Sequence, residues 1–222
     1  MSTSTVPLFH ELDTYDKLKF LMVRVHDAFK LGYHNILQHL DTPPLDDLPN
    51  FIGYSTAWAQ NIVDHHDTEE ALLFPFLSKH LNMDGEIEQH KVMHAALDDF
   101  IAFLHDPRNV QPDTFDADAM RTKLVALKDP LFTHLDEEVS HIGRENVQVF
   151  DRAEVEDICV QLDKYAQAHG NPWTEVPYML SHIAPPYHGT FPEMPWVVRK
   201  LMVPVFAFRY RGYWKYSPYP VA

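Results

Sequence analysis

The sequence predicts an all-α protein: an up-down-up-down four-helix bundle with an additional C-terminal helix and an extension rich in proline and aromatic residues. Apolar residues recur every three or four positions along four long stretches, as in amphipathic helices. Many of the 17 prolines cluster at residues 41–49 and after residue 171, where they would end helices. The sequence has no run of alternating β-branched residues bounded by tight-turn dipeptides, so no strands are expected.

The first two helices are predicted over about residues 14–40 and 51–80. The proline-rich segment 41–49 separates them, and the sequence LNMDG predicts a turn after the second. The apolar face of the first helix carries Leu18, Met22, Val25, Phe29, Tyr33 and Ile36. The corresponding face of the second carries Trp58, Ile62, His65, Glu69, Leu72 and Phe76.

Two further bundle helices are predicted over about residues 86–104 and 117–143, joined by a polar loop. Pro130 is expected to kink the latter helix or to start its second half. A fifth helix is predicted over about residues 153–169, with Gly170 as its C-terminal cap. Residues 1–170 are therefore predicted to form the bundle, and residues 171–222 an extension that packs on it.

Composition excludes several classes of function. The net charge of −14 makes nucleic acid an unsuitable partner. The single cysteine, Cys159, excludes an internal disulfide and a thiolate metal cluster, and it fits a reducing compartment. The sequence has neither an uncharged apolar run long enough to span a membrane nor a recognisable secretory signal, so a cytoplasmic location is expected.

The C-terminal tail has a different charge from the rest of the chain. Residues 195–222 contain five basic residues and no acidic one. The tail could pack against the acidic bundle, or it could form a basic amphipathic segment that touches a membrane surface. Because Pro204 would interrupt a long amphipathic helix, docking on the bundle is the favoured interpretation.

Histidine and glutamate recur on the apolar faces of all four bundle helices. Side chains three or four positions apart project from one helical face and can bind one centre. The candidates are His26 and His34, His65/Glu69 and His66/Glu70, His90 and His94, and His134/Glu138, with His141/Glu145 as a further pair. Imidazole and carboxylate donors without sulfur suit iron, manganese or zinc better than calcium or magnesium.

The chain resembles the hemerythrin-like (HHE cation-binding) family in four successive segments. These are YHNILQHL (33–40), VDHHDTEEALLFPFL (63–77), GEIEQHKVMH (85–94) and LFTHLDEEV (131–139). The aromatic tail, with GYWKYSP, resembles the C-terminal extension of fungal members. In that family the second helix carries H-x-x-x-E followed by Phe-Pro, so Phe74-Pro75 implies His65 and Glu69. The resemblance implies a metal site of His34, His65, Glu69, His90, His94, His134 and Glu138.

The resemblance also implies two iron ions (Fe2+/Fe3+), oxo- or hydroxo-bridged, with manganese or zinc as alternatives. The expected function is a non-haem di-iron protein that binds O2, iron or a related small ligand for storage, sensing or detoxification. Five neutral imidazoles would leave the site less anionic than a carboxylate-rich one, which favours the ferrous pair and reversible O2 binding. The alternatives are a di-iron oxidase or oxygenase acting on a small organic substrate, and an interaction module with a structural metal.

Overall fold

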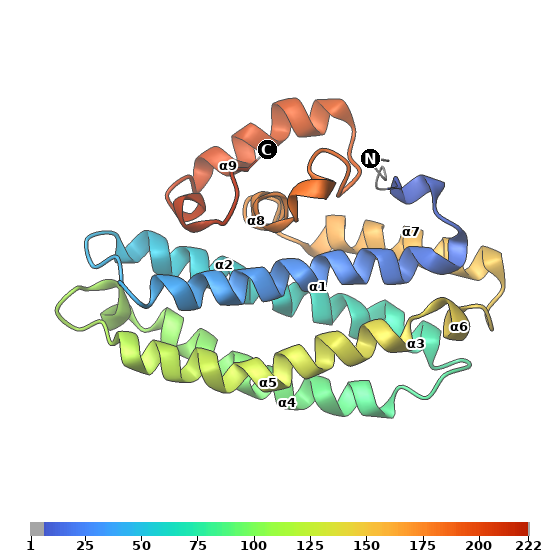
Figure 1. The fold of residues 1–222 in the computed structure, drawn as a ribbon, viewed down its shortest axis with the longest axis horizontal. Helices are drawn as coiled ribbons and strands as arrows, with labels where there is room; N and C mark the ends of the chain where they lie inside the picture. The colour runs from blue at the N-terminus through green and yellow to red at the C-terminus, as the bar shows by residue number, and fades with distance from the viewer. Residues whose placement is uncertain (1–6, 222) are drawn as a thin grey trace, which may run out of the picture.

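The computed structural model describes residues 7–221, and every regular element within that range is helical (Figure 1). The all-α prediction is confirmed. Residues 1–6 and 222 lie outside the described residues. The first six belong to the predicted bundle segment 1–170 and to the N-terminus in which no secretory signal is expected, and residue 222 ends the predicted extension 171–222.

Four long helices build the bundle: α1 (Thr14–His39), α2 (Leu48–Thr68), α4 (Asp84–His105) and α5 (Ala117–His141). Helices α4 and α5 run side by side, and they contact α2 and α1 respectively (Figure 1). Large apolar side chains meet between the four helices, among them Phe29, Tyr33, Trp58 and Phe100. Their burial removes a large apolar area from water and is the main force holding the helices together.

Acidic side chains begin two of these helices. Asp13 accepts a hydrogen bond from the backbone N–H of Tyr15 (3.2 Å) at the start of α1. Asp116 accepts one from the N–H of Ala119 (2.8 Å) at the start of α5. Each cap satisfies an amide that the first helical turn leaves without a partner.

Pro130 lies inside α5, and the helix is continuous from Ala117 to His141. Neither a separate second helix nor a break is present, so of the two expected alternatives a restart of the helix at Pro130 is wrong. The carbonyl left without its N–H partner belongs to Ala126, which lies on the exposed face of α5. Water can therefore satisfy this carbonyl, so the proline is tolerated.

The second predicted helix is divided. After α2 comes a π-helical turn, η2 (Glu69–Leu73), and then the short helix α3 (Phe74–Leu77). Pro75 lacks an N–H, so the carbonyl of Ala71 cannot be bonded as in an α-helix, and the wider turn accommodates the proline. The extra residue shifts the downstream face by one position, so Leu73 rather than the predicted Leu72 enters the core.

Shorter elements connect and cover the bundle. They are η1 (Phe9–Glu11), η3 (Pro107–Val110), α6 (Arg144–Val147), α7 (Arg152–His169), α8 (Glu175–His182), η4 (Pro185–Tyr187), η5 (Val198–Met202), α9 (Val203–Arg209) and η6 (Tyr213–Tyr216). Helix α7 lies against α1 and α2, and Gly170 directly follows its last residue.

The C-terminal extension contacts the bundle through buried aromatic side chains. The hydroxyl of Tyr178, on α8, donates a hydrogen bond to the carbonyl of Ala28 (2.9 Å). The hydroxyl of Tyr54, on α2, lies 2.7 Å from Nε2 of His182. Figure 1 shows α8 and α9 on the side of α1 and α2 that faces away from α4 and α5.

None of the helices among residues 7–221 combines the length and the apolar character needed to cross a bilayer.

Candidate metal centre

Two groups of nitrogen and oxygen donors meet inside the bundle. The first comprises His66, Glu69, His90 and His134, and the second His26, His65, Glu69 and Glu138. Within each group, one donor atom from each residue lies within 4.8 Å of all the others. Glu69 belongs to both groups, so its two oxygens can join two neighbouring sites. The donors come from α1, α2, the π-turn η2, α4 and α5.

Imidazole nitrogens approach one another closely in both groups. Nε2 of His26 lies 3.1 Å from Nε2 of His65, and Nε2 of His90 lies 3.1 Å from Nε2 of His134. Two nitrogen ligands at about 2.0–2.1 Å from one cation, and at right angles to each other, would be roughly 3.0 Å apart. The spacing of both pairs therefore suits two ligands of a shared cation.

Hydrogen bonds at the far side of two rings set their tautomers. Nδ1 of His26 donates to the carbonyl of Leu135 (2.9 Å), and Nδ1 of His90 lies 2.9 Å from Oε1 of the half-exposed Glu70. Since a carbonyl and a carboxylate accept hydrogen bonds, Nδ1 carries the proton in each ring. The Nε2 lone pairs are thereby directed into the centre, which is how outer partners orient metal-binding histidines.

The two carboxylates are buried without hydrogen-bond partners. All four oxygens of Glu69 and Glu138 are enclosed in this way. Oε1 of Glu69 is 2.8 Å from Nε2 of His65, and Oε2 of Glu138 is 3.3 Å from Nε2 of His26, but neither pair has hydrogen-bond geometry. A buried carboxylate without partners is costly, and cations placed between these groups would remove that cost.

The electrostatics of the centre differ between its two carboxylates. Burial raises the pKa of Glu138 well above its usual value, and the neighbouring Glu69 raises it further. Burial also acts to raise the pKa of Glu69, but the imidazoles of His65, His90 and His66 outweigh burial and hold it well below its usual value. A donor oxygen of Glu69 lies within 4.8 Å of one of Glu138. Two carboxylates so close together do not both ionise readily without a cation between them.

Three of the histidines, His26, His66 and His134, are held in the neutral form, which is the form that binds metals. Burial lowers the pKa of His26 and of His66 well below the usual value. Burial likewise lowers the pKa of His134 to about 3. At these three histidines, a cation entering the centre would therefore meet free nitrogen lone pairs rather than imidazolium ions.

The structure brings together five of the residues that the sequence predicted as ligands: His65, Glu69, His90, His134 and Glu138. It does not bring His34 to them. That side chain is exposed, and its ring lies against Phe132, with 5.6 Å between the ring centroids. Because Tyr33 lies on the buried face of α1, the next residue is turned by about 100° towards solvent. His26 supplies the donor from α1 instead.

His94 lies outside both groups, whereas His66, which the sequence offered as an alternative to His65, enters the first group while His65 enters the second. His94 lies at the margin, with 24% of its side chain exposed and Nε2 3.8 Å from Oε1 of Glu70. His66 is fully buried, and neither of its ring nitrogens has a hydrogen-bond partner. Its ring centroid is 4.7 Å from that of His90 and 5.0 Å from that of His134. The signal in the sequence was the adjacent pair of histidines, both of which enter the centre.

The remaining candidate pair does not reach the centre. His141 is half exposed, and its ring nitrogen contacts the carboxylate of the buried Glu86 near the start of α4. Glu145 belongs to α6, beyond the end of α5. The turn at Ile142 and Gly143 separates the two residues, so they cannot share a helical face.

The donor set fits metal cations. It combines imidazoles with two carboxylates whose oxygens have no hydrogen-bond partner, and it contains no sulfur. Such a set suits iron, manganese or zinc. Both donor groups are therefore candidates for cation binding.

The family model for the hemerythrin HHE cation binding domain matches residues 20–145 of the chain. No curated protein and no solved structure gives a significant match. The matched range begins within α1, ends just beyond α5 and includes every donor of the two groups. The match covers more than half of the 222 residues, and it coincides with the bundle that encloses the centre. The chain belongs to the hemerythrin HHE cation-binding domain family.

Proposed function

We propose that this chain is a non-haem di-iron protein that binds O2, or iron itself, inside its helical bundle for storage, sensing or detoxification. One observation carries the proposal: two groups of donors, all buried except the partly exposed His65, share Glu69, and their carboxylates lack hydrogen-bond partners. A centre for a single structural ion would need only one such group. The buried single cysteine, Cys159, fits a reducing compartment, and we place the protein in the cytoplasm.

Each donor group would hold one cation. His66, His90 and His134 would bind the first, with His94 as an alternative imidazole at the margin, and His26 and His65 would bind the second. Glu69 would contact both cations, and Glu138 would bind the second and approach the first, since its Oε2 is 3.9 Å from Nε2 of His134. Neutral imidazoles outnumber carboxylates in this set, which favours iron in its ferrous state.

When bound, the two ions would supply a reversible one-electron couple at each metal and coordination positions for a small ligand. The chain itself supplies the surroundings. The ring of Phe74 lies 4.6 Å from that of His90, and the ring of Phe29 lies 5.3 Å from that of His65, as measured between centroids. These apolar rings form part of the wall of the centre.

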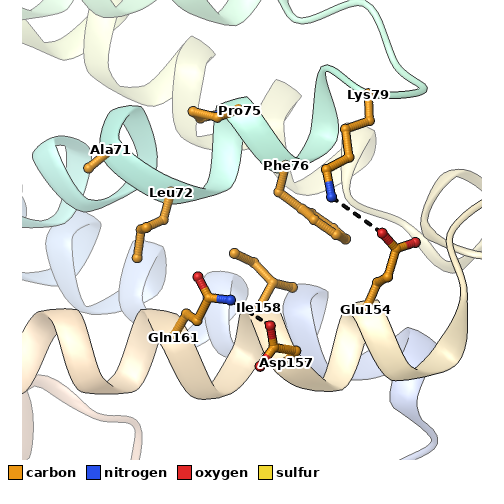
Figure 2. A pocket seen from close by; sticks show the side chains of 9 residues that line it. All are labelled: Ala71, Leu72, Pro75, Phe76, Lys79, Glu154, Asp157, Ile158 and Gln161. Atoms are coloured by element: carbon orange, nitrogen blue, oxygen red, sulfur yellow. Dashed lines mark hydrogen bonds and ion pairs between the residues drawn. The ribbon is translucent and has the colours of Figure 1, made fainter.

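Two surface pockets lie away from the metal centre. A pocket of about 320 Å³ lies between α3 and α7, and Figure 2 shows its wall of Leu72, Phe76 and Ile158 beside the Lys79–Glu154 ion pair. A second pocket, of about 270 Å³, lies near Tyr213. Neither pocket is lined by a donor of the metal centre. Neither of these two pockets is therefore a candidate for the substrate pocket of an oxidase or oxygenase, which would lie beside the donors.

Metal analysis with optical spectroscopy tests the proposal. We expect protein purified without added metal to contain about two irons per chain, and its absorption bands to change reversibly as O2 is added and removed. His26→Ala should lose most of the iron, whereas the matched variant His34→Ala should retain it. Of these two histidines of α1, His26 lies in the centre and His34 is exposed to solvent.

Three results would contradict the proposal. Zinc as the sole bound metal would leave no redox function. Equal iron content in His26→Ala and His34→Ala would place the ligands elsewhere. Continuous O2 consumption that depends on an added organic substrate would indicate an oxidase or oxygenase.

A further inference from the structure

The helical segment from Trp196 to Arg209 presents an apolar stripe to solvent. It runs without interruption through η5 and α9. Its exposed large apolar side chains, which we call the outward stripe, are Trp196 (67% exposed), Val197 (53%), Leu201 (59%), Met202 (44%), Val205 (56%) and Phe208 (66%). They recur at the three- and four-residue spacing of one helical face. Soluble proteins rarely leave such a contiguous apolar face uncovered.

The opposite face holds this helix on the protein. Val203 is buried, and the ring of Phe206 packs edge-on against Trp173, with 5.2 Å between centroids. Arg199 donates a hydrogen bond to the carbonyl of Pro192 (2.8 Å). Helix α9 also contacts α8, and Figure 1 shows it at the outer side of the molecule, away from α4 and α5. The outward stripe is therefore a surface of the folded chain.

Pro204 does not interrupt the helix, contrary to the sequence-based argument. The π-turn η5 ends at Met202, and Pro204 follows within the first turn of α9. The backbone N–H of Val203 bonds to the carbonyl of Val198, five residues earlier, and this wider turn accommodates the proline ring. The tail can thus dock on the bundle and still present an amphipathic helix.

Positive charge lies within the outward stripe and at its C-terminal end. Lys200 is exposed within it, and Arg209 and Arg211 are exposed beside its end. The guanidinium of Arg211 lies over the ring of Phe208, 4.7 Å from its centroid. Within residues 7–221 none of these three cations forms an ion pair with a carboxylate of the chain, although the net charge is −14. Residues 195–222 contain no acidic residue at all.

We propose that the outward stripe inserts into the surface of a bilayer that contains anionic lipid. Tryptophan, phenylalanine and leucine would enter the boundary between headgroups and acyl chains, while Lys200, Arg209 and Arg211 would contact the lipid phosphates. An apolar face bordered by cations is the pattern of interfacial helices. A symmetric contact between two copies would bring two clusters of like charge together, which opposes association.

Vesicle binding by the full-length, metal-loaded protein tests this inference. We expect sedimentation with vesicles of phosphatidylcholine and phosphatidylserine, much weaker sedimentation with pure phosphatidylcholine, and release by salt. The double variant Leu201→Asp/Val205→Asp should bind at least tenfold more weakly. Lys200→Gln/Arg209→Gln should weaken binding to the anionic vesicles by roughly tenfold or more.

A matched control uses exposed valines away from the stripe. Val92, on α4, and Val125, on α5, are 53% and 51% exposed, so Val92→Asp/Val125→Asp adds the same charge elsewhere. This variant should keep most of the binding, and circular dichroism and metal content should match the wild type in all variants. Absence of binding to anionic vesicles at low salt would overturn the proposal, as would equal loss in the control. Light scattering that shows a dimer dissociated by Leu201→Asp/Val205→Asp, without vesicle binding, would identify the stripe as a contact between copies.

Discussion

At the scale of single residues, the centre contains buried polar side chains that no hydrogen bond within the protein satisfies and that a bound cation would satisfy. Glu69, Glu138 and His66 are buried, and their polar atoms lack hydrogen-bond partners. Burying such groups costs several kcal/mol unless a partner compensates, which is about the order of a domain's whole stability. We therefore expect the folded bundle to be markedly less stable without metal.

His66 and His94 provide a residue-scale prediction. Both are near His90, but His66 is enclosed without partners, whereas His94 is partly exposed. His66→Phe should lower the iron content and change the optical spectrum more than His94→Phe does. Metal analysis and absorption spectra of the two variants, purified side by side, measure the difference. A larger loss in His94→Phe would make the marginal histidine the third imidazole of the first group.

At the scale of elements, proline has opposite consequences in two helices. Pro75 follows the π-turn that carries Glu69, whereas Pro130 lies in the continuous helix α5. Helical turns with an extra residue are frequent at functional sites. Here the turn lets one segment present donors upstream and a core face of Leu73 and Phe74 downstream.

Substitution of each proline by alanine separates these roles. Pro130→Ala restores a backbone donor in a regular helix, so the free energy of unfolding should rise by about 1 kcal/mol or more, with unchanged metal content. Pro75→Ala restores the backbone N–H whose absence favours the π-turn, so a regular α-helical turn can form instead. That turn would rotate the downstream residues by about 100° relative to Glu69, and the metal content should fall. Urea unfolding and metal analysis report the two effects. Unchanged metal content in Pro75→Ala would show that the turn is held by other contacts.

At the scale of the whole molecule, the extension and the bundle meet at Gly32. A methyl group there would lie 2.5 Å from Cδ1 of Trp58 and 2.5 Å from the hydroxyl of Tyr178. Trp58 also donates a hydrogen bond to the carbonyl of Phe29 (2.9 Å), and Tyr178 donates one to Ala28. Both neighbours are buried and anchored, so neither can move aside freely.

Gly32→Ala should therefore destabilise the protein by about 1–3 kcal/mol through overpacking. Gly85→Ala is the matched control, because a methyl group in the first turn of α4 meets nothing within 4 Å. That variant should be neutral or more stable by up to about 1 kcal/mol. Thermal unfolding of both variants tests the difference, and a stable Gly32→Ala would mean that the extension can separate from α1.

The residues that local spacing could predict are those whose partners lie on the same helix. His65 with Glu69, and His134 with Glu138, are four residues apart, and this spacing alone puts each pair on one face. The helical stretches themselves follow from apolar periodicity and agree with α1, α4 and α5 within a few residues. The helix before Phe74 was also predictable, but its division at the π-turn was not.

The sequence by itself determined that the chain is helical, which faces are apolar, and that imidazoles and carboxylates accompany those faces, because these properties depend on spacing along one helix. Only the tertiary structure decided that His26 rather than His34 meets the centre, that both His65 and His66 enter it, and that the last helix leaves an apolar face uncovered. Which residues of neighbouring helices lie at the same level along the bundle, and which segment covers each helical face, depend on packing between parts of the chain that are far apart in sequence.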